Sequence, residues 1–250
     1  MQVLVVLPTY NESENIERVL HMIRESMPES GILVVDDGSP DGTADIAERV
    51  GKEIGSVEIM RRTDKAGLGA AYRAGFRRGM DDGWDVLIEM DADLSHDPAA
   101  LPSLVAPIVE GASLVVGSRY VPGGSIPNWS WHRRLLSRGG NLYAAAMLGL
   151  DITDSTSGFR AYSSSALRRI DLDEVRSEGY GFQIEMAYRV LRVGGRVVEV
   201  PIRFVDRVEG TSKMSLHIVV EALLLVTAWG VARAGRAALR FLRTAREHRS

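Results

Sequence analysis

The stretch Val86-Leu87-Ile88-Glu89-Met90-Asp91-Ala92-Asp93 is a short apolar run that ends in two carboxylates one residue apart. Such a run predicts a buried strand, and it places Asp91 and Asp93 at the strand's carboxyl end, where open α/β sheets bind their ligands. In extended backbone, alternate residues point to the same side, so both acids can face one oxygen-preferring cation such as Mg or Mn. A polar strand end with helix-capping aspartates is the plainer alternative for these two residues taken alone.

Strand, polar loop and helix alternate on both sides of this stretch. Further strands are expected at Val3 to Leu7, Ile32 to Val35, Val57 to Met60, Leu114 to Gly117 and Val197 to Ile202, while Asp154 to Arg160 is expected to be a polar loop. Helical spacing is found from Ile16 to Ile23, about Ala44 to Val50, Pro98 to Val109, Leu135 to Leu150 and Phe182 to Val193. The alternation predicts an α/β protein with a mostly parallel sheet flanked by helices.

The composition fits one large globular domain. Of the 250 residues, 45% are hydrophobic and 25% are charged, which is ordinary usage for a folded protein. No cysteine is present, so disulfides and thiolate metal sites are excluded. The only early apolar run, Val3 to Leu7, is too short for a secretory signal, so we expect no export.

Five polar clusters stand at the expected ends of strands. They are Pro8 to Glu12, Asp36 to Asp41, Lys65 to Gly69, Asp91 to His96 and Ser118 to Tyr120. In a parallel sheet these ends lie on one edge, so the clusters would line a single crevice. Turn chemistry alone explains the glycines, but it does not explain why acids and bases gather there.

The absence of two nucleotide-binding motifs limits the reactions that the sequence can support. The chain has neither the Gly-x4-Gly-Lys-Ser/Thr loop nor Gly-x-Gly-x2-Gly after its first strand, which disfavours nucleoside triphosphate hydrolysis and nicotinamide binding. An acid-lined crevice with a metal-binding pair of carboxylates instead fits the diphosphate of a nucleotide sugar.

Several fragments, in this order, resemble one family. LPTYNESENI, VVDDGSPDGTADIA, KAGLGAAYRAGF, MDADLSHDP, VGSRYVPGG, TSGFRAY, GFQIEM and GTSKM are similar to motifs of the polyprenol- or dolichol-phosphate mannose synthases, which are inverting glycosyltransferases of family two with the Rossmann-like GT-A fold. The resemblance covers residues 2 to about 215. It implies transfer of mannose from GDP-mannose to a polyprenyl phosphate, with Mg or Mn as cofactor.

The resemblance also implies roles for individual residues. The nucleotide sugar is expected to contact Pro8, Tyr10, Glu12, Val35, Asp37, Lys65, Gly69, Asp91, Ala92 and Asp93. The metal is expected at Asp91, Asp93 and Ser95, where many relatives have a longer Gln in place of Ser95. The acceptor phosphate is expected at Arg119, Arg133, Ser137 and Arg203, and the reaction is expected to depend on Asp91, Asp93, Arg119 and Lys213.

A phosphate acceptor would simplify the chemistry. It is already ionised near neutral pH and attacks without a general base, so we expect in-line displacement at the anomeric carbon with inversion. Three alternatives stay open: a UDP-glucose donor, a hydroxyl acceptor served by a carboxylate between Asp154 and Phe159, and a non-catalytic nucleotide-sugar sensor or membrane scaffold.

The carboxyl terminus has a different character from the rest of the chain. We expect a catalytic domain over residues 1–213 and a basic, amphipathic helical region over residues 214–250. From Arg233 onward there are six arginines and one acid, and Arg233, Arg236, Arg240 and Arg243 follow helical spacing. Its uncharged part, Ala222 to Ala232, is too short to span a bilayer.

That pattern suits a helix lying on anionic lipid, and Trp129 and Trp131 favour the same interface. We therefore expect peripheral association with the cytoplasmic face of the membrane and no nucleic-acid partner. Packing of the helix on another protein, and a separate membrane-anchoring subunit, stay open.

Overall fold

The computed structural model describes residues 1–63, 67–206 and 216–247. Its centre is a seven-stranded sheet with the order β3-β2-β1-β4-β6-β5-β7. The strands are β1 (Val3–Thr9), β2 (Gly31–Asp36), β3 (Val57–Arg61), β4 (Val86–Glu89), β5 (Leu114–Ser118), β6 (Arg160–Ser163) and β7 (Val197–Pro201). The strand pairs are parallel except for those that β6 makes with β4 and β5. The expected α/β class with a mostly parallel sheet is confirmed.

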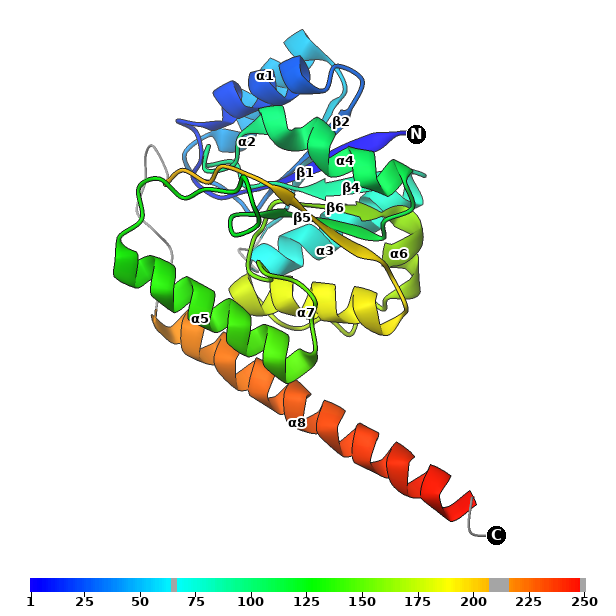
Figure 1. Ribbon diagram of the computed structural model, residues 1–250. Coiled ribbons are helices and arrows are strands. Elements are labelled where there is room, and N and C mark those ends of the chain that lie inside the picture. Colours follow the sequence, from blue (N-terminus) through cyan, green and yellow to red (C-terminus); the bar gives the residue numbers. More distant parts are fainter. Residues whose placement is uncertain (64–66, 207–215, 248–250) are drawn as a thin grey trace.

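Helices cover both faces of the sheet (Figure 1). One face carries α1 (Ile16–Ser26), α2 (Thr43–Ile54) and α4 (Leu101–Val109), which follows the 3-10 turn η1 (Pro98–Ala100). The other carries α3 (Leu68–Asp81), α6 (Ser164–Arg169) and α7 (Gly179–Arg192). Beyond α7 lie α5 (Trp131–Leu148) and the long α8 (Leu216–Glu247), side by side.

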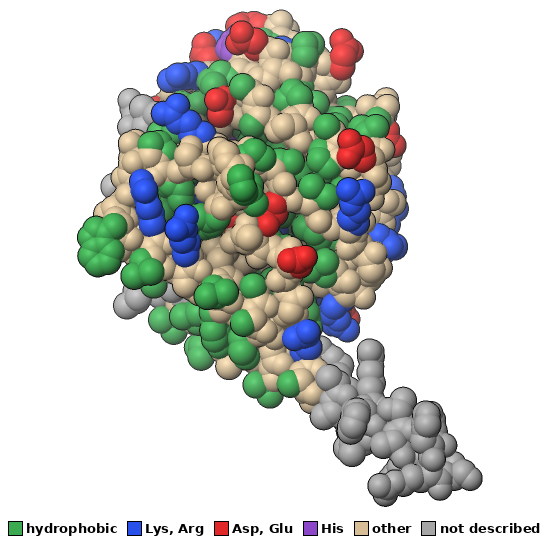
Figure 2. Space-filling model, viewed as in Figure 1, with side chains coloured by type: hydrophobic (Ala, Val, Ile, Leu, Met, Phe, Trp, Pro, Cys, Tyr) green, Lys and Arg blue, Asp and Glu red, His purple; other side chains and the backbone are tan. Residues whose placement is uncertain are grey.

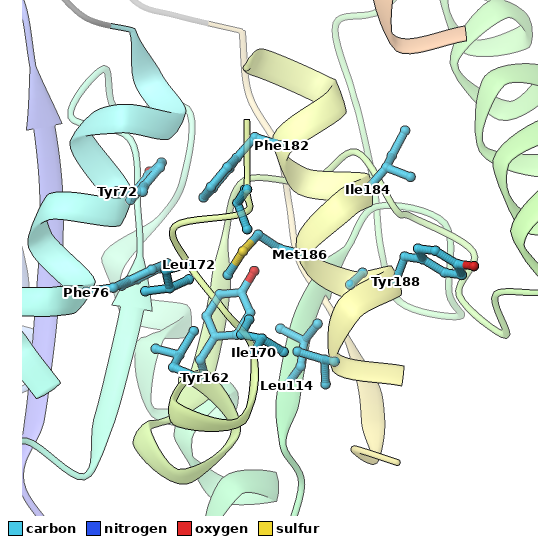
Figure 3. Packing of buried hydrophobic residues seen from close by; sticks show 14 of the residues in the cluster. Tyr72, Phe76, Leu114, Tyr162, Ile170, Leu172, Phe182, Ile184, Met186 and Tyr188 are labelled. Atoms are coloured by element: carbon cyan, nitrogen blue, oxygen red, sulfur yellow. The ribbon is translucent and has the colours of Figure 1, made fainter. Parts of the chain in front are cut away.

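Each face of the sheet has its own hydrophobic core. Apolar residues at helical spacing on α1, such as Ile16 and Ile23, are fully buried against the first face. On the second face, aromatic side chains join α3 to α7: the rings of Tyr72 and Phe182 stack with centroids 5.9 Å apart (Figure 3). Burial of each large apolar side chain contributes about 1.5–3 kcal/mol, so these two layers fix the helices that carry the loops of the site.

Two local features differ from expectation. The strand that begins at Val86 ends at Glu89, so Asp91 and Asp93 lie beyond the strand, and Asp93 lies in a bend. The expected polar loop from Asp154 is confirmed as far as Phe159, but the antiparallel strand β6, which begins at Arg160, was not expected. The Arg160 side chain is fully buried and donates to the carbonyl oxygens of Ser155, Ser157 and Gln183, so its charge holds a loop together instead of facing water.

The first half of α8 packs on α5 and α7. Ala222 and Val226 are buried, and a 2.7 Å hydrogen bond joins the hydroxyl groups of Tyr143 on α5 and Thr227 on α8. Among the described residues, no helix combines the length and the apolar content that crossing a bilayer requires.

Candidate active site

The order of the strands reverses between β1 and β4, and in open α/β sheets ligands bind in the crevice outside the carboxyl ends of the strands at such a point. The loops after β1, β2 and β4 meet there and bring together residues that are far apart in sequence. Pro8 and Val35 are register partners on β1 and β2, as are Thr9 and Asp36. The structure thus gathers the expected nucleotide-binding residues of the first two clusters at one edge.

The two adjacent aspartates after β2 have different surroundings. Asp36 accepts hydrogen bonds from the Thr9 hydroxyl at 2.9 Å and from the Ser39 backbone N–H at 2.9 Å, so it fixes the turn. Asp37 is 6% exposed and lies 3.2 Å from a guanidinium nitrogen of Arg62. Asp36 and Asp37 are thus held by different partners, one within the turn and one on the segment that follows β3.

The loop after β1 is held in an unusual conformation. Asn11 has φ 57°, a left-handed conformation that is uncommon outside glycine. The backbone N–H of Glu12 donates to the Thr43 hydroxyl at 3.0 Å, and the Glu12 carboxylate accepts from the Asn15 side chain at 3.2 Å. Tyr10 and Glu12 are both partly exposed at this edge.

The acids after β4 lie in a tight turn. Asp93 is 3% exposed, and its Oδ1 accepts from both the backbone N–H of Ser95 at 3.0 Å and the Ser95 hydroxyl at 2.6 Å. Leu94, between them, has φ 62°. Ser95, itself 2% exposed, therefore orients the Asp93 carboxylate, a contact that its place in the sequence does not reveal.

Asp91 is more accessible, with 30% of its side chain exposed. Its Oδ1 accepts from the Tyr72 hydroxyl at 3.3 Å, and its backbone N–H points to Nδ1 of His96 at 3.4 Å. Burial lowers the pKa of His96 to about 4, so this imidazole is neutral and can accept. His96 therefore supports the turn.

The carboxylates of Asp91 and Asp93 fit a hard divalent cation. Among the residues described, no group of three or more acids and histidines could hold a metal. Mg typically binds through one or two carboxylates, with water and substrate phosphates completing its shell. The chemistry of this pair suits a cation that arrives with a diphosphate.

The cluster after β3 includes Gly69, which the resemblance places at the nucleotide sugar. Its backbone N–H, at the start of α3, donates to the Glu178 carboxylate at 2.7 Å. The positive end of this helix is thus occupied by a side chain of the protein. Lys65, expected to contact the nucleotide sugar, lies outside the described residues.

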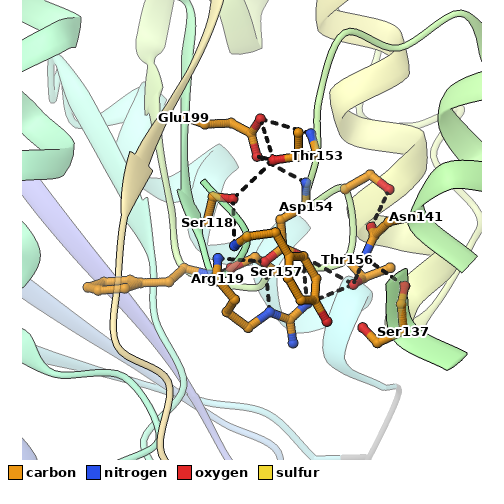
Figure 4. A network of polar contacts seen from close by, with 12 residues as sticks. Ser118, Arg119, Ser137, Asn141, Thr153, Asp154, Thr156, Ser157 and Glu199 are labelled. Carbon is orange, nitrogen blue, oxygen red and sulfur yellow. Dashed lines mark hydrogen bonds and ion pairs between the residues drawn. The ribbon is translucent and has the colours of Figure 1, made fainter. Parts of the chain in front are cut away.

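Arg119 and Asp154 form a buried, bidentate ion pair (Figure 4). Asp154 is fully buried, and it accepts from Nε of Arg119 at 2.7 Å, Nη2 at 2.6 Å and the backbone N–H at 2.9 Å. Arg119 also donates to the Thr156 hydroxyl at 2.8 Å, and the neighbouring carboxylate raises its pKa. Arg119 is therefore a fixed cation, held by a residue that the sequence suggested only as the base of a hydroxyl-acceptor enzyme.

Further polar residues hold this pair in place. Glu199 on β7 accepts from the backbone N–H groups of Thr153 and Asp154 at 2.8 and 3.0 Å. Asn141 on α5 is 2% exposed and bonds to the hydroxyl groups of Ser155 and Thr156 (Figure 4). These contacts join β7 and α5 to the loop that orients Arg119.

An apolar groove runs from this cluster between α5, α7 and α8. It is lined by Trp129, Arg133, Leu136, Ser137, Gly140, Tyr143, Thr156, Tyr180, Ile184, Ala222, Leu223 and Val226. Two of the expected acceptor-phosphate residues, Arg133 and Ser137, thus lie on its wall, and Thr156 connects it to Arg119.

Arg133 is held in place by its neighbours, whereas Arg203, another expected acceptor residue, does not line the groove. Arg133 packs 3.9 Å from the centre of the Trp129 ring, and both side chains bond to Asp206, Arg133 at 3.0 Å and Trp129 at 2.9 Å. Arg203 is exposed beside Ser125 and is not among the residues that line the groove. Lys213 lies outside the described residues.

The sequence did not single out several residues of this site. They are Tyr72, Asn141, Glu178, Tyr180, Glu199 and Asp206. The fragments KAGLGAAYRAGF, which contains Tyr72, TSGFRAY and GFQIEM indicated no more than the neighbourhood of some of them, because their roles depend on contacts across the fold.

The mostly parallel seven-stranded sheet with helices on both faces agrees with the GT-A fold that the resemblance implied. Residues 4–171 match the family profile described as "Glycosyl transferase family 2". The chain belongs to this family, and it is a glycosyltransferase.

Two relatives are similar over nearly the whole chain. An "Undecaprenyl-phosphate mannosyltransferase" of Micrococcus luteus is 54% identical over 93% of this chain and 95% of its own. A "Polyprenol monophosphomannose synthase" of Mycolicibacterium smegmatis is 48% identical over 91% of this chain and 86% of its own. The resemblance found in the sequence motifs is confirmed.

A solved structure shares the fold at lower identity. Glucosyl-3-phosphoglycerate synthase from Mycobacterium tuberculosis, in complex with Mn2+, UDP and glucosyl-3-phosphoglycerate, superposes with a TM-score of 0.67 at 23% identity. The match covers 94% of this chain and 80% of that one.

Proposed function

We propose that the protein transfers mannose from GDP-mannose to the phosphate of a long polyprenyl lipid, with inversion, giving polyprenyl-phosphate-mannose and GDP. The observation that carries the proposal is the apolar groove with Arg133 and Ser137 on its wall and Arg119 next to it. An isoprenoid phosphate combines an apolar chain with an anionic head, which such a groove with basic residues would accept. The names of both close relatives combine mannose with a polyprenyl phosphate.

The buried state of Asp154 favours a phosphate acceptor over a hydroxyl acceptor. A hydroxyl nucleophile needs a general base within reach. Asp154 is the only carboxylate between residues 154 and 159, and both of its oxygens hold Arg119. A phosphate oxygen is ionised at neutral pH and requires no such base, so the arginine matters for binding and orientation.

The donor is assigned to the crevice between β1 and β4. The residues proposed to contact the nucleotide sugar are Pro8, Tyr10, Glu12, Val35, Asp37 and Ala92. Lys65 and Gly69, from the segment that follows β3, are proposed to join them. Asp91 and Asp93 would hold the cation, Mg or Mn, which neutralises charge on the departing diphosphate. Ser95 is proposed to act by orienting Asp93.

The acceptor is assigned to the groove. Arg119, Arg133 and Ser137 are proposed to bind its phosphate, and Arg203 and Lys213 are proposed to join them. Arg133 is held by Asp206 and by the Trp129 ring, so its guanidinium is oriented before a lipid arrives.

The lipid substrate is proposed to reach the protein at a membrane surface. Trp131, Leu135 and Leu142 on α5 are 76%, 65% and 72% exposed. Figure 2 shows hydrophobic side chains gathered over α5 in the lower left of the view, with Lys and Arg side chains beside them. Together with the arginine-rich sequence of residues 214–250, this face supports peripheral association with the cytoplasmic side of a membrane. Residues 1–213 would then form the catalytic domain, with or without an additional anchoring subunit.

The identity of the sugar donor is tested by measuring how much radiolabelled sugar is transferred into organic-extractable lipid. Purified protein is incubated with polyprenyl phosphate, Mn or Mg, and either GDP-mannose or UDP-glucose. Label from GDP-mannose alone is expected. Label from UDP-glucose alone would retain the fold and the acceptor but replace the donor.

A further inference from the structure

A long-range contact joins the start of α3 to the start of α7. Glu178 stands at the N-cap position of α7, yet its carboxylate points to the other helix. Its Oε2 accepts from the backbone N–H of Gly69 at 2.7 Å, and its Oε1 accepts from that of Ala70 at 3.2 Å. These N–H groups have no partner within their own helix, and the N-cap residue of α3, Gly67, has no side chain with which to serve them.

The approach of Glu178 is close enough to require glycine on the other side. A Cβ atom on Gly67 would come within 2.5 Å of Oε2 of Glu178, and one on Gly69 within 2.8 Å of the Ser177 carbonyl oxygen. Gly67 also has φ +97°, a conformation that favours glycine. The glycines of the segment that follows β3 therefore fit this contact, whereas a phosphate-binding loop would leave the N–H groups for the ligand.

An ion pair between Arg73 and Glu178 adds to the contact between the starts of α3 and α7. Arg73, one turn into α3, lies 3.3 Å from Oε1 of Glu178 and donates weakly to the Ser177 carbonyl oxygen at 3.5 Å. Its side chain is only 15% exposed. A carboxylate is thus placed at the positive end of α3 and is charge-paired from the side, which favours a single orientation of the helix.

The orientation of α3 bears directly on the crevice. Tyr72, on the same helix, is fully buried, stacks on Phe182 of α7 and donates its hydroxyl to Asp91 at 3.3 Å. Moving the start of α3 would therefore displace the Tyr72 hydroxyl from Asp91.

We infer that Glu178 is a positioning residue of the donor site: by capping α3 from α7 it fixes the helix whose Tyr72 hydroxyl donates to Asp91. The inference rests on the proposed function only in taking this crevice as the donor site. It predicts that loss of the carboxylate weakens binding of the nucleotide diphosphate and leaves the groove for the acceptor intact.

The experiment compares Glu178→Ala and Glu178→Gln with a matched cap removal elsewhere. Ser163→Ala removes the hydroxyl that caps α6 by accepting from the Ala166 backbone N–H. Ser163 pairs with Val86 at the start of β4, so it lies away from the carboxyl ends of the parallel strands. Binding of GDP and of UDP is measured by calorimetry with Mn, together with the melting temperature and the KM for polyprenyl phosphate. Using both nucleotides separates this test from the identity of the donor.

We expect the dissociation constant of whichever nucleotide binds to rise about tenfold in Glu178→Ala and about threefold in Glu178→Gln, in line with loss of one cap and one ion pair. Ser163→Ala is expected to lower the melting temperature with less than about twofold change in binding. If both Glu178 variants bind nucleotide as the wild type does, the contact is only a structural cap. If Glu178→Ala does not fold, the Glu178→Gln result decides by the same criterion.

Discussion

The pair formed by Arg119 and Asp154 allows the sharpest test by substitution, and Asp154→Asn is the change to make. The amide keeps the size of the side chain but removes its charge and turns an acceptor oxygen into a donor. Three hydrogen bonds of 2.6 to 2.9 Å from Arg119 then lose their anionic partner. The Arg119 side chain is only 5% exposed, so solvent cannot replace the lost charge.

The expected loss of stability in Asp154→Asn follows from the burial of this ion pair. Breaking a buried ion pair by removing one partner costs about 3–5 kcal/mol. In a protein of this size, 1 kcal/mol shifts the melting temperature by about 2–4 °C, so a decrease of about 6–20 °C is expected. Turnover should fall as well, because Arg119 would no longer be held beside the groove.

Thermal unfolding followed by circular dichroism measures the effect, and a matched control is available at the surface. Asp45 pairs with Arg61 at 2.7 Å, but the two side chains are 77% and 49% exposed. Asp45→Asn should therefore cost less than about 1 kcal/mol. If Asp154→Asn melted within about 2 °C of the wild type while turnover disappeared, Asp154 would act in the chemistry, as a hydroxyl-acceptor enzyme requires.

Three further predictions concern the core, the metal site and the membrane face. Burial raises the pKa of Glu89 from 4.5 to about 7, so the stability that Glu89 contributes is fully present below pH 4.5 and is lost as the pH rises to about 7. The melting temperature of Glu89→Gln minus that of the wild type should therefore increase from pH 5 to pH 8. A difference that stays constant over this range would contradict the prediction. Ser95→Ala removes the 2.6 Å hydrogen bond to Asp93 and should raise the Mn concentration needed for half-maximal turnover about threefold to tenfold. An unchanged metal titration would show that Ser95 does not contribute to metal binding. Leu142→Glu on α5 should abolish sedimentation with anionic vesicles, whereas Val109→Glu, which is equally exposed on α4, should not; equal binding by both would place the membrane contact elsewhere.

The sheet and its acidic edge could be predicted because their causes are local. The apolar run at Val86 to Ile88 and the repeated spacing of strand, loop and helix reflect burial against a sheet, which each segment records in its own sequence. Because parallel strands end on one edge, the clustering of Asp37, Asp91 and Asp93 followed from topology alone.

The pairing of charges could not be predicted, because it depends on contacts across the fold. Glu178 caps α3 through Gly69, which lies 109 residues earlier in the chain, and Asp154 holds Arg119 from 35 residues away. Arg160 is fully buried and donates to three backbone carbonyl groups, which its neighbours in the sequence do not indicate. In each case the sequence indicates a charge, but only the structure shows which partner it has.

The central claim is that the acceptor is a lipid phosphate, bound beside Arg119 and Arg133 and attacking without a general base. The most direct measurement offers the purified protein GDP-mannose with either a polyprenyl phosphate or the unphosphorylated polyprenol of the same length, under the same detergent and Mn conditions. Transfer to the phosphate with no transfer to the alcohol is the predicted result. Mannose transfer to the alcohol at a comparable rate would contradict the account, because the fully buried Asp154 leaves its loop without a carboxylate to activate a hydroxyl.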